Sequence, residues 1–278
     1  MHRSYLFVPG DAPGMLETID VFDADAVIID LEDSVAPNRK DEARALLEAF
    51  LTHHKFDHTA MYVRVNAVDE TAWFEADIKA LQALAIDGIV LPKATPKTLK
   101  TLQEVYADQT LPDVIALLET PGVFFQLPEV TAYPFVKGLM LGGEDLRQAI
   151  EAQKMPRSEE LAMARGLIIL AASEASIQAI DTPFTDIKDT KGLQDDAFHA
   201  AKLGMHGKAC IHPNHVQVVN TVFTPDQKSI EQAERIIAMH EKTQSMRFSL
   251  DGFMVDKPVI ERAKRTVKRA KQFKGRRV

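Results

Sequence analysis

Eight short apolar runs recur along this chain, and longer segments with helical periodicity separate them. The runs lie at residues 5–8, 27–30, 61–65, 88–91, 114–118, 138–141, 179–180 and 208–211. Most are continuously apolar instead of alternating, which is typical of parallel strands buried on both faces. Amphipathic segments at 73–84, 96–106, 158–175 and 193–203 predict the intervening helices. This rhythm predicts an α/β fold, a (β/α)8 TIM barrel, with a doubly wound open sheet as the alternative.

The same rhythm sets the expected domain organisation. At 278 residues, the chain is long enough for one large α/β domain with a short extension. We expect the catalytic barrel to occupy residues 1–225 and a C-terminal helical extension to occupy residues 226–278. No low-complexity linker divides the sequence.

Composition and local motifs argue against several classes of protein. The net charge of -7 does not favour the broad basic face of a general nucleic-acid-binding protein. The single cysteine, Cys210, cannot form an internal disulfide, so a buried residue in a reducing compartment is expected. Pro9, Gly10 and Asp11 interrupt the first apolar run, which predicts neither a secretory signal nor a membrane span. We therefore expect a cytoplasmic protein. No phosphate-loop or dinucleotide motif supports nucleotide hydrolysis or hydride transfer.

Polar and ionisable residues follow nearly every predicted strand. In a parallel barrel all βα loops open at the carboxyl ends of the strands, where functional groups gather. A solvated loop is also polar, so one such residue is weak evidence, but their presence at nearly every strand end predicts a site. The residues are Asp30, Glu32, Asp33, Arg64, Asn66, Lys93, Glu119, Glu144, Asp145, Asp181 and His212.

A pair of carboxylates at this edge predicts a metal site. Glu119 and Asp145 end consecutive predicted strands, which would be about 5 Å apart in a barrel. Carboxylates held that close repel each other unless a cation or a proton separates them. Magnesium prefers oxygen ligands and often takes only one or two protein carboxylates. We therefore predict Mg2+ at Glu119 and Asp145, with a purely structural role as the alternative. Glu144 and the acidic residues at 30–33 either orient this site or cap helices and pair with lysines.

Two basic side chains are candidates for substrate binding. Arg64 ends the third predicted strand, and a guanidinium there can hold a substrate carboxylate through two parallel hydrogen bonds. An ion pair of Arg64 with Glu32 or Asp33 is the alternative, and both roles are compatible. Lys93 can act in the same way, or it can simply end a strand with a solvated amine.

Nine motifs spread over nearly the whole chain carry a family resemblance. They are RSYLFVPG, IIDLEDSV, VRVN, VLPKA, LLETPGV, LGGEDL, AIDTPFTDIKD, GKACIHP and DGFMVDKP, in this order. Together they resemble the citrate lyase beta subunit and the malyl-CoA and citramalyl-CoA lyases of the HpcH/HpaI aldolase group. The family pattern usually has GAED where this chain has Gly142, Gly143, Glu144 and Asp145, and both acids remain.

The resemblance implies roles for several residues. It implies Mg2+ bound by Glu119 and Asp145, and Arg64 as a ligand of the substrate carboxylate. It also implies that Asp256, in MVDKP, reaches the site of a neighbouring subunit as a general acid or base within a trimer. By itself, Asp-Lys-Pro is usually a helix start. The catalytic set expected on this basis is Asp256, Arg64, Glu32 and Asp33, with Arg3 and Lys93 as further substrate ligands and Arg3 on a phosphate.

These roles predict a lyase that acts on a hydroxyacyl thioester. A hydroxyl and carboxylate chelated by the metal would favour loss of the hydroxyl proton. Cleavage would then leave a 2-keto acid and the enolate of an acetyl thioester. Thioester hydrolysis, a pyruvate-type aldolase reaction and a non-catalytic thioester-binding subunit are the alternatives.

The segment 257–278 contains ten Lys or Arg residues against one acid, Glu261. Such a basic helix suits the phosphates of coenzyme A or an acidic acyl carrier protein, although a solvated helix or subunit contact explains it equally simply.

Overall fold

The computed structural model describes residues 1–54, 56, 58–106 and 109–273. The chain divides into two compact units, Met1–Asn220 and Thr221–Val278. Of the basic segment at 257–278, residues 274–278 lie outside the described residues. Within the described part of the chain, no helix is both long and apolar enough to cross a membrane.

The larger unit is a closed barrel of eight parallel strands in chain order, with β8 pairing back onto β1. The strands are β1 (Ser4–Pro9), β2 (Ala26–Asp30), β3 (Ala60–Arg64), β4 (Gly88–Leu91), β5 (Asp113–Leu118), β6 (Val136–Leu141), β7 (Gln178–Asp181) and β8 (Gly207–Cys210). Each overlaps one of the predicted apolar runs. The predicted (β/α)8 barrel is therefore confirmed, and the open sheet is wrong.

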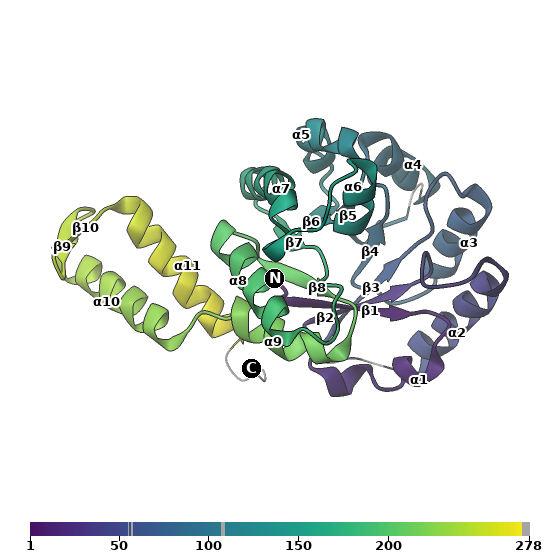
Figure 1. Ribbon diagram of the computed structural model, residues 1–278, viewed down its shortest axis with the longest axis horizontal. Coiled ribbons are helices and arrows are strands. Elements are labelled where there is room, and N and C mark those ends of the chain that lie inside the picture. Colours follow the sequence, from purple (N-terminus) through teal and green to yellow (C-terminus); the bar gives the residue numbers. More distant parts are fainter. Residues whose placement is uncertain (55, 57, 107–108, 274–278) are drawn as a thin grey trace. The chain divides into compact units, whose positions relative to one another are not determined.

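Helices surround the strands on the outside of the barrel (Figure 1). They are α1 (Pro13–Leu16), α2 (Lys40–His53), α3 (Thr71–Leu81), α4 (Pro96–Tyr106), α5 (Leu127–Thr131), α6 (Gly143–Ala149), α7 (Ala162–Glu174), α8 (Thr190–Leu203) and α9 (Pro213–Phe223). Short 3-10 turns are η1 (Ile19–Phe22), η2 (Pro37–Arg39), η3 (Pro121–Phe125) and η4 (Pro156–Leu161). One face of each strand packs against the helices, and the other face packs inside the barrel. Both faces are therefore buried, as the continuous apolar runs predicted. The buried cluster inside contains Tyr5, Ala26, Ile28, Tyr62, Val90, Ile115, Leu117, Met140, Ile180 and Ala209.

The helix predicted at 158–175 begins later than expected, because a kinked turn precedes it. Arg157 and Ser158 in η4 both have left-handed backbone conformations, with φ of 57° and 51°. The buried guanidinium of Arg165 holds this turn, because its Nη1 donates to Arg157 O at 2.8 Å. The kink therefore depends on a partner in α7 that periodicity does not reveal.

The smaller unit is a helical hairpin with a short β-hairpin at its end (Figure 1). It contains α10 (Gln227–Thr243), β9 (Phe248–Leu250), β10 (Phe253–Val255) and α11 (Lys257–Phe273). Ala233 and Ile236 of α10 share a core with Val255, Ile260 and Ala263. Asp256 lies at the start of α11, where its carboxylate accepts a hydrogen bond from Val259 N at 3.3 Å.

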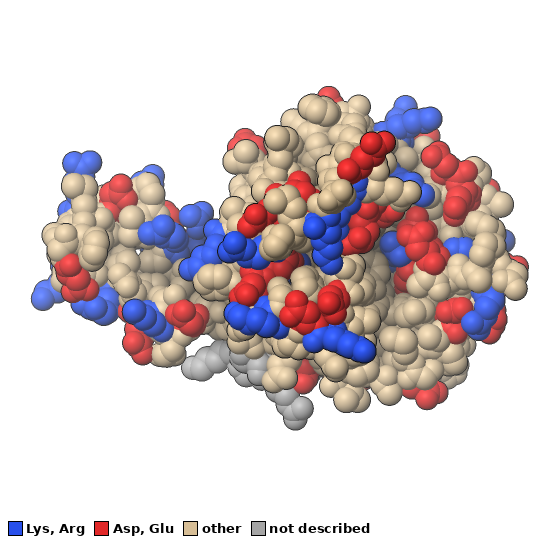
Figure 2. All heavy atoms as spheres, in the orientation of Figure 1, with Lys and Arg blue, Asp and Glu red and all other residues tan. Residues whose placement is uncertain are grey.

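The two units differ in charge. Residues 221–278 contain 14 Lys and Arg against 7 Asp and Glu, although the whole chain carries 33 against 40. Side chains of both signs are nevertheless interspersed on the face shown in Figure 2. The acidic excess of the chain therefore belongs entirely to the barrel unit.

Candidate functional site

The end of β2 and the end of β3 bring a carboxylate and a guanidinium together. The strand register pairs Asp30 with Arg64, and the two side chains form a bidentate contact with both N–O distances at 2.7 Å. Arg64 Nη1 also lies 3.1 Å from Glu32 Oε2 and 3.4 Å from Asp33 Oδ2. The guanidinium stacks over Phe7 at 5.1 Å from the ring centroid. Arg64, Asp30, Glu32 and Asp33 are called the Arg64 cluster below.

The backbone that carries Glu32 is held from two sides. Asp30 accepts hydrogen bonds from Glu32 N at 2.9 Å and from Ser34 N at 3.1 Å. From the helix side, the buried ammonium of Lys40 donates to Leu31 O and Glu32 O, both at 2.7 Å. Two charged side chains on opposite sides of the loop thus fix its course. Sequence reasoning missed Lys40, and no spacing rule would have found its two carbonyl partners.

Glu119, at the end of β5, is buried beside the end of β6 because two glycines allow a close approach. A Cβ at Gly142 would lie 2.6 Å from the Glu119 Cβ. A Cβ at Gly143 would lie 2.6 Å from Thr182 Oγ1, and Gly143 N donates to that hydroxyl at 3.0 Å. The glycine at 143, where the family pattern has alanine, is therefore explained by the hydroxyl of Thr182.

Lys93 contacts the site through its backbone more closely than through its amine. Its backbone N–H donates to Glu119 Oε1 at 2.6 Å, and its φ of 47° is left-handed. The half-exposed Lys93 ammonium lies 3.9 Å from Glu32 Oε1. Lys93 thus orients Glu119 and leaves a cation at the edge of the site.

The acidic groups of the site are unequally compensated. Burial, together with the nearby Asp145 carboxylate, raises the pKa of Glu119 to about 7. Burial likewise raises the pKa of Glu32 to about 8, despite the charge of Arg64. Burial also acts on Asp30, but its hydrogen bonds and charge contact with Arg64 lower its pKa below the usual value. The negative charge around Glu32 and Glu119 therefore exceeds what the positive charge of Arg64 compensates.

Arg64 and Glu119 border an open cavity of about 160 Å³. Its polar lining includes Arg64, Glu119, Glu144 and Asp145, and its apolar wall includes Phe7 and Ile211. No group of three or more His, Cys, Asp or Glu side chains in the described part of the chain is arranged to hold a metal. A pair of carboxylates is nevertheless enough for magnesium, which retains water or substrate oxygens at its other positions. Buried Glu119 beside exposed Asp145 therefore fits this ion.

Other residues predicted at the strand ends lie elsewhere. Asp181 is fully buried and bonds Arg165 and Lys208, at 2.8 Å and 2.6 Å, so it belongs to the wall between strands and helices. Asp196 of α8 completes this cluster with contacts to both cations. Arg165, Asp181, Asp196 and Lys208 are called the Lys208 network below. Asp181 does end β7, as predicted, but its buried contacts with Arg165 and Lys208 place it in this network and not in the cavity lining.

Arg3 and Asn66 also take buried positions. Arg3 precedes β1 and is fully buried, with its Nε and Nη2 each 2.8 Å from an Asp25 oxygen. This placement does not bring it to the cavity, and burial leaves no surface for a phosphate. Asn66 is buried and donates to Asp77 Oδ2 at 2.7 Å, so it supports the loop after β3. His212 is partly exposed after β8, and its Nδ1 accepts from Asn214 N at 3.2 Å.

The sequence analysis also missed Arg147 of α6, which organises the loop after β6. Its side chain is largely buried and contacts Glu160, and its Nη1 lies 2.5 Å from Glu144 Oε1. Glu144 therefore pairs with arginine, one of the two roles left open for it. Its three-residue spacing from Arg147 was the one available signal.

With this geometry established, comparison with known proteins gives the family. The family model described as HpcH/HpaI aldolase/citrate lyase matches residues 3–213, so the chain belongs to this family. A second model, described as a C–C bond lyase of the TIM-barrel fold, matches residues 160–274. The chain is thus a carbon–carbon lyase by family, which confirms that prediction.

Relatives align along almost the full length. The chain is 33% identical to the citrate lyase subunit beta of Leuconostoc mesenteroides subsp. cremoris, over 97% of this chain and 93% of the relative. It is 33% identical to a (3S)-malyl-CoA thioesterase of Cereibacter sphaeroides, over 96% and 94%. The crystal structure of CitE from Mycobacterium tuberculosis, in complex with magnesium, acetoacetate and coenzyme A, matches with a TM-score of 0.82 and 33% identity. That match covers 97% of this chain and 98% of CitE.

Proposed function

We propose that the protein is a magnesium-dependent lyase that cleaves a citryl-, citramalyl- or malyl-type thioester into a 2-keto acid and an acetyl thioester. The observation that carries this proposal is the carboxylate pair Glu119 and Asp145 beside Arg64 in one cavity. The pair is suited to a hard cation, and Arg64 is suited to a carboxylate. The magnesium and coenzyme A in the related CitE crystal support the same ligands here.

Different side chains have different roles in the proposed reaction. Asp30 occupies Arg64 Nε and Nη2, so the carboxylate of the substrate would bind at Nη1 and replace its contacts with Glu32 and Asp33. Glu32 and Asp33 lie on the same side of Arg64 and restrict where that carboxylate binds. Magnesium held by Glu119 and Asp145 would stabilise negative charge on the substrate oxygens. Loss of the hydroxyl proton to solvent water and rupture of the carbon–carbon bond would then give the keto acid and the enolate of the acetyl thioester.

The enolate carbon needs one proton to become the acetyl methyl group. We assign this proton transfer to Asp256 of a neighbouring subunit in a trimer, with the extension at 226–278 carrying it. We expect Asp256→Asn to retain magnesium binding but to suppress proton exchange at the methyl group of acetyl-CoA, measured by NMR in deuterated water. Normal exchange in this variant would remove Asp256 from the mechanism.

Product formation by the purified protein tests the proposal directly. We expect citramalyl-, malyl- or citryl-CoA to yield a keto acid and acetyl-CoA with magnesium, and neither product with EDTA. Thioester hydrolysis is the second candidate, because the similarity to the malyl-CoA thioesterase is as high as that to citrate lyase. Release of free coenzyme A without a keto acid would favour hydrolysis. If only thioesters of a carrier protein are turned over, the carrier of the acyl group is that protein and not coenzyme A.

A further inference from the structure

The backbone that carries Asp145 passes directly from β6 into α6. Asp145 is exposed and lies two residues after Gly143, the first residue of α6. The other proposed magnesium ligand, Glu119, is buried and accepts a hydrogen bond from Lys93 N at 2.6 Å. A site with one fixed and one exposed carboxylate depends on what holds the exposed one, because outer contacts orient the ligands of a metal. The contacts of residues 142–143 therefore determine how well the two carboxylates share one ion.

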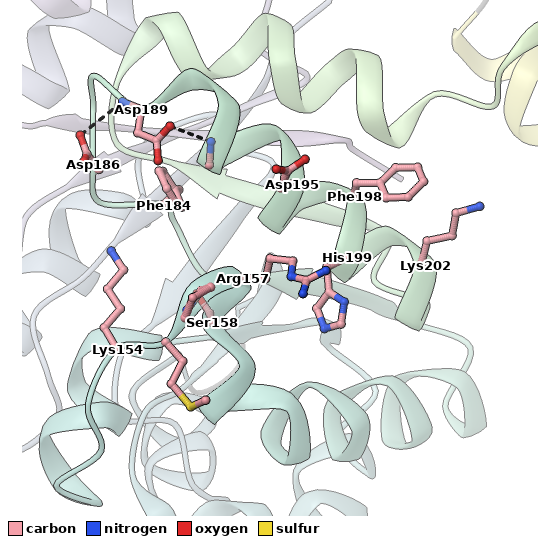
Figure 3. Close-up of a pocket in the computed structure, with 13 residues that line it drawn as sticks. Lys154, Arg157, Ser158, Phe184, Asp186, Asp189, Asp195, Phe198, His199 and Lys202 are labelled. Atoms are coloured by element: carbon pink, nitrogen blue, oxygen red, sulfur yellow. Dashed lines mark hydrogen bonds between the residues drawn. The ribbon is translucent and has the colours of Figure 1, made fainter.

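The start of α6 has no capping side chain of its own. The first four N–H groups of a helix need acceptors from outside the helix, and an Asp, Asn, Ser or Thr before the helix usually supplies one. Asp189 does this for α8, where its carboxylate accepts a hydrogen bond from Gly192 N at 2.8 Å (Figure 3). The residue at the equivalent position before α6 is Gly142, which has no side chain. A side-chain acceptor for α6 must therefore come from another part of the chain.

Thr182, the residue after β7, supplies that acceptor. Its Oγ1 accepts a hydrogen bond from Gly143 N at 3.0 Å, and both residues are buried. Gly142 N donates to Leu118 O, at the end of β5, at 2.9 Å, so the strands on either side of β6 hold these two amides. A buried N–H left without an acceptor is costly. The hydroxyl of Thr182 thus joins the β7 side of the barrel to the backbone that leads to Asp145.

The burial of Thr182 suits it to holding backbone and not to binding a ligand. Thr182 is 0% exposed although it borders the cavity, so its hydroxyl presents no surface to a ligand there. The hydroxyl reaches the backbone because residue 143 is glycine, where a Cβ would lie 2.6 Å from Thr182 Oγ1. Thr182 therefore acts on the site through the backbone of α6.

The residue before Thr182 anchors it in the barrel wall. Asp181 is the last residue of β7, and its carboxylate accepts from Arg165 Nε at 2.8 Å and from Lys208 Nζ at 2.6 Å. All three of these charged side chains are fully buried. A buried polar network whose members are satisfied makes its surroundings rigid. Thr182 therefore connects the Lys208 network to the loop that bears Asp145.

We propose that Thr182 is a positioning residue for the magnesium site. By holding Gly143, its hydroxyl fixes the first turn of α6 and keeps Asp145 in the same cavity lining as Glu119, where both can bind one ion. This inference rests on the proposed function for the identity of the ion, but the effect that it predicts is measured without substrate.

Calorimetric titration of the full-length protein with magnesium, in the absence of substrate, tests this role. Thr182→Val replaces the acceptor oxygen with a methyl group, so we expect the magnesium affinity to fall at least about tenfold, as is typical when an outer partner of a metal site is removed. Thr182→Ser keeps the oxygen and should bind magnesium within about threefold of the wild type. Thr182→Ala removes the same oxygen and is the second variant should Thr182→Val not fold. Wild-type affinity in the variants that lack the oxygen would overturn the proposal.

Ser4→Ala is the matched control for the loss of a buried hydroxyl. Ser4 Oγ accepts a hydrogen bond from Asp25 N at 3.1 Å, and Ser4 is fully buried at the start of β1, at the opposite end of the strand from the site. Both Thr182→Val and Ser4→Ala should lower the midpoint of urea unfolding in EDTA, because each leaves a backbone N–H without its acceptor. Of these two variants, only Thr182→Val should also weaken magnesium binding. An equal loss of magnesium affinity in Ser4→Ala would reduce the effect to general destabilisation and overturn the proposal.

Kinetics separate this inference from the proposed function. With an active thioester, Thr182→Val should require at least about tenfold more magnesium for half-maximal turnover, whereas Thr182→Ser should follow the wild type. Weaker magnesium binding by Thr182→Val, in a protein that turns over none of the thioesters, would leave the role of Thr182 intact and refute the proposed reaction. Lyase turnover with the same magnesium requirement in Thr182→Val and the wild type would refute the role of Thr182 although the reaction stands. A wild-type protein that binds no magnesium would overturn both.

Discussion

The barrel unit contains two charge clusters that differ in balance and exposure. The Lys208 network contains two cations and two carboxylates, and all four side chains are at most 1% exposed. The Arg64 cluster contains one guanidinium, which lines the cavity, against three carboxylates. Glu32 Oε2 makes no aligned hydrogen bond with any described residue. The presence of charged side chains alone therefore does not distinguish a ligand-binding site from a structural cluster.

The pKa values express the same difference. Burial acts on both clusters, but the charges of Lys208 and Arg165 lower the pKa of Asp196 to about 2. Burial and neighbouring carboxylates raise the pKa of Glu32 to about 8. A charge-balanced network keeps its carboxylates ionised, whereas the surplus of acids near Arg64 favours binding of a cation or proton. The Lys208 network thus has the features of a structural element, and the Arg64 cluster those of a ligand site.

The largest expected effect comes from breaking the balanced network. Lys208→Met leaves Asp181 and Asp196 with Arg165 as their one remaining cation among the described residues. We expect the free energy of unfolding to fall by about 3–5 kcal/mol, as when one partner of a buried ion pair is removed. Urea denaturation measures this loss. The control, Lys191→Met, removes a surface pair with Asp195 and should cost less than about 1 kcal/mol. Equal losses would contradict the structural role of the network.

The next effect concerns the acidic side of the site. Glu119→Gln removes a charge but keeps the shape, so we expect little loss of stability in EDTA and a large loss of magnesium affinity. Turnover should fall by roughly 10²–10³-fold, since metal stabilisation of a transition state amounts to several kcal/mol. Calorimetry and steady-state kinetics measure the two quantities. A variant that binds magnesium and turns over normally would refute the metal assignment.

The contrast between the clusters also marks what the sequence could predict. Periodicity located all eight strands, because parallel strands buried on both faces are continuously apolar. Strand order then indicated that Arg64, Glu119 and Asp145 lie near one another. Strand order does not predict the direction in which a side chain at a strand end points. The side chain of Asp181, for example, points toward α7 and α8. Lys40, Arg147 and Arg165 were missed because their partners depend on loop paths that no local pattern encodes.

An effect of intermediate size is expected from acid. Asp196 has its pKa lowered from the usual 3.8 to about 2 by Lys208 and Arg165, against the effect of burial. Because this pKa is lowered in the folded protein, the contribution of Asp196 to the free energy of unfolding is present above about pH 4. It is lost as the pH falls toward 2. The shift corresponds to roughly 2 kcal/mol. Urea denaturation from pH 5 to pH 2 should therefore show a steeper loss for the wild type than for Asp196→Asn. Parallel curves would show that Asp196 does not carry this dependence.

The smallest effect tests the outer edge of the Arg64 cluster. Asp33 is 68% exposed and lies 3.4 Å from Arg64, whereas Asp30 holds the same guanidinium at 2.7 Å from a buried position. A screened pair of this kind contributes about 0–1 kcal/mol. If Asp33 only restricts the substrate carboxylate electrostatically, Asp33→Asn should change KM by less than about fivefold and leave kcat nearly unchanged. A large fall in kcat with KM unchanged would instead make Asp33 a catalytic group. Asp30→Asn, which disrupts the bidentate contact, provides the matched comparison and should impair both substrate binding and stability.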